Sequence, residues 1–376
     1  MKKDFLLALS TLIGLTIGAG IFGIPYSILK SGIIPGLFYF FILGGVVFLI
    51  HALFGEIVLR TKEELRLVGY AQKYLGKKAK ILITFTTLIG TSGVLLVYMI
   101  LGGSFLKNIF PVSSIDEFYF SILFWFFLSL FVFFGKRFIS GLEFFTNLFF
   151  FLILFLIFFF SFLKFDFQKI APFSFDIFLP YGIILFSLLA FEAVPEAEEI
   201  LKEKKNLKKV IFLNTLITCL IYFLFSVFII GVSGQMTSKE ALSGLSPFLG
   251  KRIIFFGLLA ALITIADSFL VLAISFRNTL RYDFKIPKYF SAFLTIILPL
   301  ILFLLGLRDF IRVIGFLGTF IGLVNGAAIV FIYKKAKVLG DRESEYSLNL
   351  PNFILYLLIA ILVLGTISHI YYEIYR

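Results

Sequence analysis

The sequence predicts an all-α polytopic membrane protein in which two five-helix units of opposite orientation precede an eleventh helix. Three observations predict this fold. Hydrophobic residues make up 60% and charged residues 15% of the 376 residues, and the mean hydropathy is +1.07, so the polar surface of a soluble protein is missing. The apolar residues form long runs between short charged segments. Two of these runs are interrupted by helix-breaking residues, at 18–23 and 191–199.

The apolar runs give eleven candidate spans, because a spanning helix needs about 20 apolar residues. The spans are predicted at 5–29, 33–59, 81–106, 118–135, 138–163, 177–200, 210–233, 253–276, 289–306, 310–333 and 351–372. Residues 135–137 separate the fourth span from the fifth, and two of these residues are basic. Since basic residues are costly at mid-membrane, a tight turn is predicted there.

Lysine and arginine residues predict the orientation of the spans. With the N-terminus in the cytoplasm, the inner segments hold 24 of the 34 basic residues, as the positive-inside rule requires. We therefore expect a multi-pass plasma-membrane protein with a cytoplasmic N-terminus and an outer C-terminus. The lipid bilayer explains the net charge of +12 without a nucleic-acid partner, and nothing in the sequence requires an oligomer.

The number of spans from one interrupted span to the next predicts an internal duplication. Five spans are an odd number, so a second copy of a five-helix unit enters the membrane from the opposite side. We predict a first unit at 1–163, an inverted second unit at 164–338, and a loop with span 11 at 339–376. Each interruption then falls in the first span of its unit, as in transporters built from inverted repeats.

The first interruption offers backbone groups to a ligand. Gly18 and Gly20 permit close approach and backbone angles that other residues avoid. The helix half that starts after this break directs its N–H groups into the gap and suits a carboxylate. Carbonyl groups on the other side suit an ammonium group or a cation, so an α-amino acid matches both sides. An alternative is that Gly14 and Gly18 form a small-residue motif for helix packing.

The same segments resemble a known superfamily of transporters. The run GLTIGAGIFGIPYSILKSGIIPG (14–36) resembles the first helix of the amino acid/polyamine/organocation superfamily, and its second half is similar to the amino acid/auxin permease and aromatic amino acid permease branches. The run SLLAFEAVPEAEEILKEKKNLKKVI (187–211) resembles the sixth helix and the loop after it. The resemblance implies a LeuT-type fold and secondary active transport of amino acids by alternating access. The driving ion would be H⁺ or Na⁺, and no other cofactor is implied.

This resemblance and the two interruptions together predict the substrate site. The predicted substrate-binding residues are Gly18, Ala19, Gly20, Ile21, Phe22, Gly23, Tyr98, Phe186, Ala190, Phe191 and Glu192. The resemblance places Tyr98 against the substrate, although an ordinary packed tyrosine is the alternative. Phe186 and Phe191 flank the second interruption and would contact the substrate side chain or form a gate.

Ionisable residues inside the spans are the candidates for ion coupling. An acid at mid-span costs about 2.5–3.5 kcal/mol on insertion scales, which makes Asp267 a functional candidate. With Thr264 and Ser268 nearby, Asp267 would bind Na⁺, or it would carry the coupling proton; a position in a water-filled vestibule is the alternative. For Glu192, a proton site, a cation ligand and a helix-end partner all remain open.

Other polar residues in the spans have simpler interpretations. Glu56 is expected to pair with Arg60 one helical turn later, and His51 is expected to be a hydrogen-bonded structural residue. A stripe of four glycines in span 10 favours close helix packing; these are Gly315, Gly318, Gly322 and Gly326.

Two other classes of protein are alternatives to a transporter. Subunits of spore-germination nutrient receptors resemble permeases of this length but sense nutrients instead of transporting them, and this alternative stays open. A membrane enzyme is not expected, because the sequence has no HExxH motif, no paired acids on a helix face and no Ser–Lys or metal constellation.

Overall fold

The structure, a computed structural model, describes residues 2–134, 142–282 and 284–375, and within these residues every regular element is a helix. The longer elements are α1 (Lys2–Thr16), α2 (Ile24–Ser31), α3 (Ile33–Arg60), α4 (Leu67–Leu75), α5 (Lys77–Ile109), α6 (Glu117–Phe134), α7 (Leu142–Leu163), α8 (Leu179–Leu188), α9 (Val194–Ile200), α10 (Leu207–Ser233), α12 (Lys251–Tyr282), α13 (Lys288–Leu304), α14 (Phe310–Leu339) and α15 (Asn352–Tyr375). This all-helical fold confirms the predicted fold class.

The described helices match the predicted spans in position. Seven of them are long and apolar enough to cross a membrane, and α1 with α2 adds an eighth span that is bent by 53°. Three shorter apolar segments, Glu117–Phe133, Leu152–Leu163 and Lys288–Leu304, stand at the positions predicted for spans four, five and nine. The predicted turn at 135–137 lies outside the described residues.

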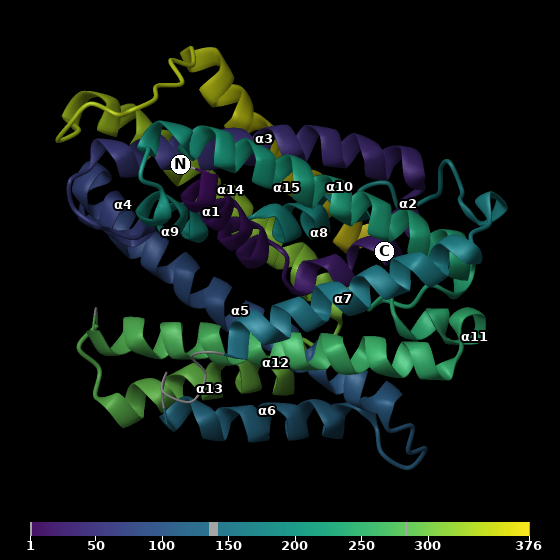
Figure 1. The fold of residues 1–376 in the computed structure, drawn as a ribbon. Coiled ribbons are helices and arrows are strands. Elements are labelled where there is room, and N and C mark those ends of the chain that lie inside the picture. Colours follow the sequence, from purple (N-terminus) through teal and green to yellow (C-terminus); the bar gives the residue numbers. More distant parts are fainter. Residues whose placement is uncertain (1, 135–141, 283, 376) are drawn as a thin grey trace.

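The helices form two groups with the broken spans between them (Figure 1). In one group α6, α12 and α13 pack against one another, and in the other α3 contacts α10 and α14, with α15 on α14. Helix α5 is tilted and contacts both α12 and α14. A buried hydrogen bond of 3.0 Å from Thr86 to Asn325 fastens α5 to α14.

The glycine stripe of α14 confirms the predicted role in close packing. A Cβ atom at Gly318 would collide with the carbonyl oxygen of Gly182 in α8, and one at Gly322 would lie 2.6 Å from the side chain of Leu185. Residues without side chains therefore let α8, the first half of the sixth span, lie directly on α14.

The predicted ion pair of Glu56 with Arg60 is also confirmed, at 2.8 Å. The buried carboxylate of Glu56 accepts further hydrogen bonds from the hydroxyl of Ser347, at 3.2 Å, and from the backbone N–H of Leu348, at 2.8 Å. Helix α3 is thereby attached to the segment that joins α14 to α15, and every oxygen of this buried acid has a partner.

Candidate functional site

The first span is interrupted where its glycines begin. Helix α1 ends at Thr16, and Gly18 has an extended backbone with φ −123° and ψ −150°. A 3₁₀ turn, η1 (Ala19–Phe22), follows and leads into α2. The N–H groups of Ala19 and Gly20 stand at the start of η1, where no preceding helical turn offers them a carbonyl. The break thus presents the carbonyl end of α1 on one side and the first N–H groups of η1 on the other.

The second interruption, predicted at 191–199 with its break at about 190–195, is shorter than the full predicted run. Helix α8 ends at Leu188, Ala190 has φ −140° and ψ 34°, and a 3₁₀ turn, η4 (Phe191–Ala193), leads into α9. The expectation that the break extends to residue 199 is wrong, because Pro195 lies in the first turn of α9. A proline is tolerated there since a first-turn N–H has no intrahelical partner.

A histidine holds the backbone of this second break. The Nε2 atom of His51, in α3, accepts a hydrogen bond of 3.2 Å from the N–H of Ala190. The side chain of His51 is fully buried. The prediction of a hydrogen-bonded histidine is confirmed, and its partner is one of the break residues themselves.

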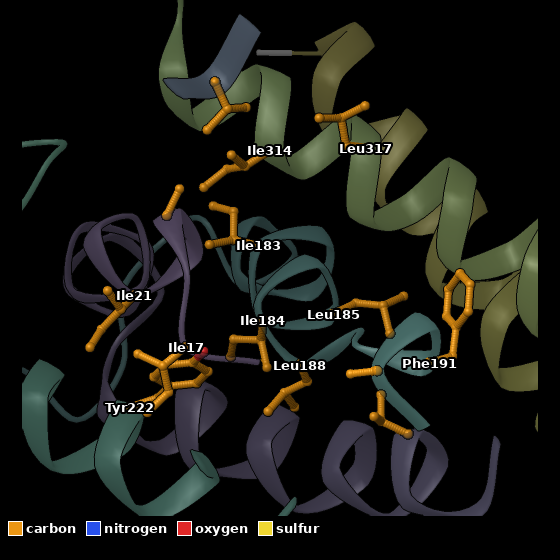
Figure 2. Close-up of a cluster of buried hydrophobic side chains, with 14 of the residues drawn as sticks. Ile17, Ile21, Ile183, Ile184, Leu185, Leu188, Phe191, Tyr222, Ile314 and Leu317 are labelled. Atoms are coloured by element: carbon orange, nitrogen blue, oxygen red, sulfur yellow. The ribbon is translucent and has the colours of Figure 1, made fainter. Parts of the chain in front are cut away.

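The two breaks lie directly against each other. A Cβ atom at Gly20 would be 2.8 Å from the Cα atom of Ser187, so Gly20 backs onto the last turn of α8. The hydroxyl of Tyr222, in α10, lies 2.9 Å from the carbonyl oxygen of Thr16 and 3.1 Å from that of Ser187. Figure 2 shows Tyr222 beside Ile17 and Ile21, within the apolar cluster that also holds Ile184 and Leu188.

Gly18 lies beside the hydroxyl of Tyr98, in α5. Among the described residues other than its two chain neighbours, a Cβ atom built on Gly18 would have one heavy atom within 4 Å, the hydroxyl oxygen of Tyr98 at 3.8 Å. The side chain of Ser268, in α12, interacts electrostatically with the hydroxyl of Tyr98, and α12 packs against α5. The structure therefore brings Tyr98 and Ser268 to the first break. We call the space between Gly18, Tyr98 and Ser268 the central gap.

The central gap is closed on the side of α2. Ile21 and Phe22 are buried, and the ring of Phe22 packs edge-on against Phe105 of α5 at a centroid distance of 5.2 Å. A Cβ atom at Gly23 would collide with the side chain of Ile314, in α14. In contrast, Gly18, Phe186 and Ala190 are partly exposed. The gap is thus sealed by apolar contacts toward α2, while Gly18, Phe186 and Ala190 keep part of their surface accessible.

The aromatic and acidic residues of the second break point in different directions. Phe191 is buried, with its ring packed edge-on against Phe54 of α3 at 6.3 Å, so it forms part of the wall behind the break. Glu192 is exposed. Its carbonyl oxygen is reached by the guanidinium of Arg66 at 3.5 Å, and Arg66 also lies 3.7 Å from the carboxylate of Glu196.

The three predicted ion-coupling residues of α12 are all partly exposed. Thr264 donates to the carbonyl oxygen of Ala260 in its own helix, at 2.9 Å. Ser268 reaches the central gap through Tyr98, and Asp267 is its neighbour in the chain. Helix α12 packs mainly on α5, α6, α7 and α13.

A charged cavity of about 520 Å³ adjoins the second break. It is lined by the end of α3, the α3–α4 segment and α9, with Lys62, Glu63, Arg66, Glu198 and Lys204 among its side chains. Since Arg66 both lines the cavity and contacts Glu192, the cavity and the break share one wall.

Sequence reasoning missed the contribution of α10. Its polar residues Asn214, Thr218, Tyr222 and Ser226 recur every four positions and are all buried. Residues four apart share one helix face, and a polar stripe in an apolar span indicates contacts with other polar groups. The four-residue spacing of these polar residues could therefore have identified Tyr222 from the sequence. On the same face of α10, the side-chain amide of Asn214 donates a hydrogen bond of 3.2 Å to the hydroxyl of Thr16.

Comparisons with known proteins agree with this architecture. The family model described as the tryptophan/tyrosine permease family matches residues 1–369. Two solved transporters share the fold. Mhp1 in an inward-facing conformation superposes with a TM-score of 0.67 at 10% identity, over 88% of this chain and 76% of that chain. MhsT in complex with L-phenylalanine gives a TM-score of 0.65 at 13% identity, over 100% of this chain and 98% of that one. No curated protein sequence matches significantly.

Proposed function

Because the chain belongs to the tryptophan/tyrosine permease family, we propose that it carries aromatic amino acids across the plasma membrane. Family and LeuT-type fold identify a secondary transporter. The proposal adds the substrate, the driving ion and the route. The substrate binds at the central gap, an H⁺ or Na⁺ gradient drives its accumulation, and the gap opens alternately to the two sides of the membrane.

The observation that carries this proposal is the pair of interrupted helices in contact at the gap. The N–H groups of Ala19 and Gly20 lie at a helix start, which is partially positive and suits a carboxylate. The carbonyl groups at the end of α1 are partially negative and suit an ammonium group. A zwitterionic α-amino acid matches this pair of opposite partial charges better than an anion or a cation does.

The surroundings of the gap favour an aromatic side chain. Next to Gly18 the gap is bounded by the hydroxyl end of Tyr98, and the partly exposed Phe186 lies on α8, the adjoining half of the sixth span. Aromatic rings pack favourably against one another. MhsT, which shares the fold, is known in complex with L-phenylalanine, and this agrees with an aromatic substrate for the present chain.

We assign the coupling ion to Asp267, Thr264 and Ser268, with Glu192, at the second break, as a further acid. A proton on Asp267, or a Na⁺ held by Asp267 and Ser268, would neutralise a charge that is costly inside a membrane. Residues 1–163 and 164–338 are proposed as the two inverted units, with 339–376 as the added span. The N-terminus lies in the cytoplasm and the C-terminus outside.

Uptake into proteoliposomes tests the proposal. The purified chain is reconstituted and given labelled L-tryptophan, L-tyrosine or L-lysine, with an imposed H⁺ gradient, Na⁺ gradient or neither. We expect concentrative uptake of the two aromatic amino acids, with one of the two gradients, and no uptake of lysine. Binding of L-tryptophan without any flux would instead support a receptor, and the absence of both binding and flux would reject an aromatic substrate.

A further inference from the structure

The hydroxyl of Tyr222 occupies the point where the two interrupted spans meet. It comes from a third span, α10, and lies within hydrogen-bond distance of the carbonyl oxygens of Thr16 and Ser187. Tyr222 is completely buried, as is Ser226 one turn later. Solvent water therefore does not reach these carbonyl groups to replace the hydroxyl of Tyr222 as a donor.

Both carbonyl groups come from the C-terminal ends of helices. Thr16 is the last residue of α1, and Ser187 is next to the last residue of α8. The last four carbonyl groups of a helix have no intrahelical partner, and they carry the negative end of the helix dipole. Two such ends repel each other when they converge, and each costs free energy when it is buried without a donor.

We propose that Tyr222 is the positioning residue that holds the two broken spans together at the central gap. Its single hydroxyl proton is shared between the carbonyl oxygens of Thr16 and Ser187. This sharing offsets the repulsion of the two helix ends and keeps the groups that bind the substrate, on η1 and at the end of α8, in register. When α1 moves relative to α8, the hydroxyl keeps one acceptor, so the movement leaves no buried donor unpaired.

The neighbouring contacts of α10 agree with this role. Asn214 lies two turns before Tyr222 on the same helix face and bonds the side chain of Thr16, so α10 holds the end of α1 at two points. Gly20 meanwhile allows the backbone of η1 to touch α8 at Ser187. The Tyr222 hydroxyl is the contact that joins the helix ends of both spans.

The inference rests on the proposed function and is tested by L-tryptophan binding to the purified full-length protein. Tyr222→Phe keeps the ring and removes the shared donor. Tyr333→Phe is the matched control, because the hydroxyl of Tyr333 is buried and has no hydrogen-bond partner in the described structure. Tyr222→p-aminophenylalanine keeps the shape and supplies two N–H donors for the two carbonyl oxygens.

We expect Tyr222→Phe to raise the Kd for L-tryptophan about tenfold, which corresponds to about 1.4 kcal/mol. Tyr333→Phe should leave the Kd unchanged, and the amine variant should restore it. A wild-type Kd in Tyr222→Phe, or an equal change in Tyr333→Phe, overturns the inference. If Tyr222→Phe does not fold, the amine variant alone tests the inference. A folded amine variant that binds L-tryptophan more weakly than the wild type also overturns the role of Tyr222.

A second measurement separates this inference from the proposed function. Amide hydrogen exchange at residues 17–20 does not require a substrate. It should become faster in Tyr222→Phe than in the wild type and in Tyr333→Phe, because the end of α1 is no longer held. Unchanged exchange there overturns the role of Tyr222. A wild type that binds no aromatic amino acid rejects the proposed substrate instead.

Discussion

The imidazole of His51 accepts a hydrogen bond of 3.2 Å from the backbone N–H of Ala190, and this bond links the buried middle of α3 to the break in the sixth span. An acceptor at Nε2 means that the ring proton resides on Nδ1. The Nδ1 atom is buried and has no partner among the described residues. Of the two ring nitrogens of His51, only Nε2 therefore contacts the second break.

Replacement of this acceptor should weaken the second break. We expect His51→Phe to lower the free energy of unfolding by about 1–3 kcal/mol, because the N–H of Ala190 is left buried and unpaired. Thermal unfolding of the purified protein measures the effect. His369→Phe is the control, since both ring nitrogens of His369 are buried without a partner in the described residues. Equal melting temperatures of the two variants would contradict the assignment.

Two glycines of the first break should respond differently to a larger side chain. Gly18 has an extended backbone that any residue adopts, and its Cβ position faces the central gap. We expect Gly18→Val to leave the fold intact and to weaken L-tryptophan binding at least about tenfold, or about 1.4 kcal/mol. Gly14→Val is the control, because a Cβ atom there meets nothing within 4 Å. Unchanged binding in Gly18→Val would remove Gly18 from the site.

The Cβ position of Gly20 faces α8 rather than the gap. A side chain at Gly20 collides with the backbone of Ser187, so Gly20→Val should force η1 away from α8 and lower the melting temperature together with binding. A variant with the melting temperature of the wild type and weakened binding would show that Gly20 borders the ligand rather than α8. Thermal unfolding with and without substrate distinguishes these outcomes.

Asp267 should decide whether uptake is concentrative. We expect Asp267→Asn to abolish gradient-driven accumulation and to retain some exchange of substrate, because a neutral amide neither binds Na⁺ as a carboxylate does nor carries the proton. Proteoliposome uptake with and without the gradient measures this, and Asp176→Asn, in the segment before α8, is the control. Undiminished accumulation in Asp267→Asn would remove this residue from the coupling mechanism.

A surface ion pair makes the free energy of unfolding depend on pH at both the acidic and the alkaline end. Lys73 of α4 lies 2.7 Å from Asp341. This hydrogen bond raises the pKa of Lys73 above its ordinary 10.5 and lowers the pKa of Asp341 below its ordinary 3.8. The contribution of Lys73 is complete below its unfolded pKa and is lost as the pH rises through its folded pKa. The contribution of Asp341 is present above its unfolded pKa and is lost as the pH falls through its folded pKa.

The pair therefore stabilises the fold between about pH 4 and about pH 10. Asp341→Asn should lower the melting temperature slightly within this window and should make its pH profile flatter at both ends. The effect is small because the pair is exposed to solvent. An unchanged pH profile in Asp341→Asn would show that the attachment of α4 to the segment after α14 contributes nothing measurable.

Much of the fold was predictable because the bilayer restricts what a chain can do. Apolar runs of about 20 residues must form helices in lipid, so the positions of the spans and the break at Gly18 followed from the residue pattern. The i, i+4 pairing of Glu56 with Arg60 and the packing of the α14 glycines also depend on local spacing alone. The second break was placed less well, because Pro195 breaks a helix interior but is suited to a first turn.

The sequence alone determined that this chain is a bundle of spanning helices with two interruptions, since hydropathy and glycine spacing are properties of neighbouring residues. Only the tertiary structure decided which groups meet at those interruptions. Tyr222 is separated by some 200 residues from Thr16, and His51 by 139 positions from Ala190. Such partners are selected by the packing of distant helices, where a buried carbonyl or N–H takes whichever polar side chain the fold brings within reach.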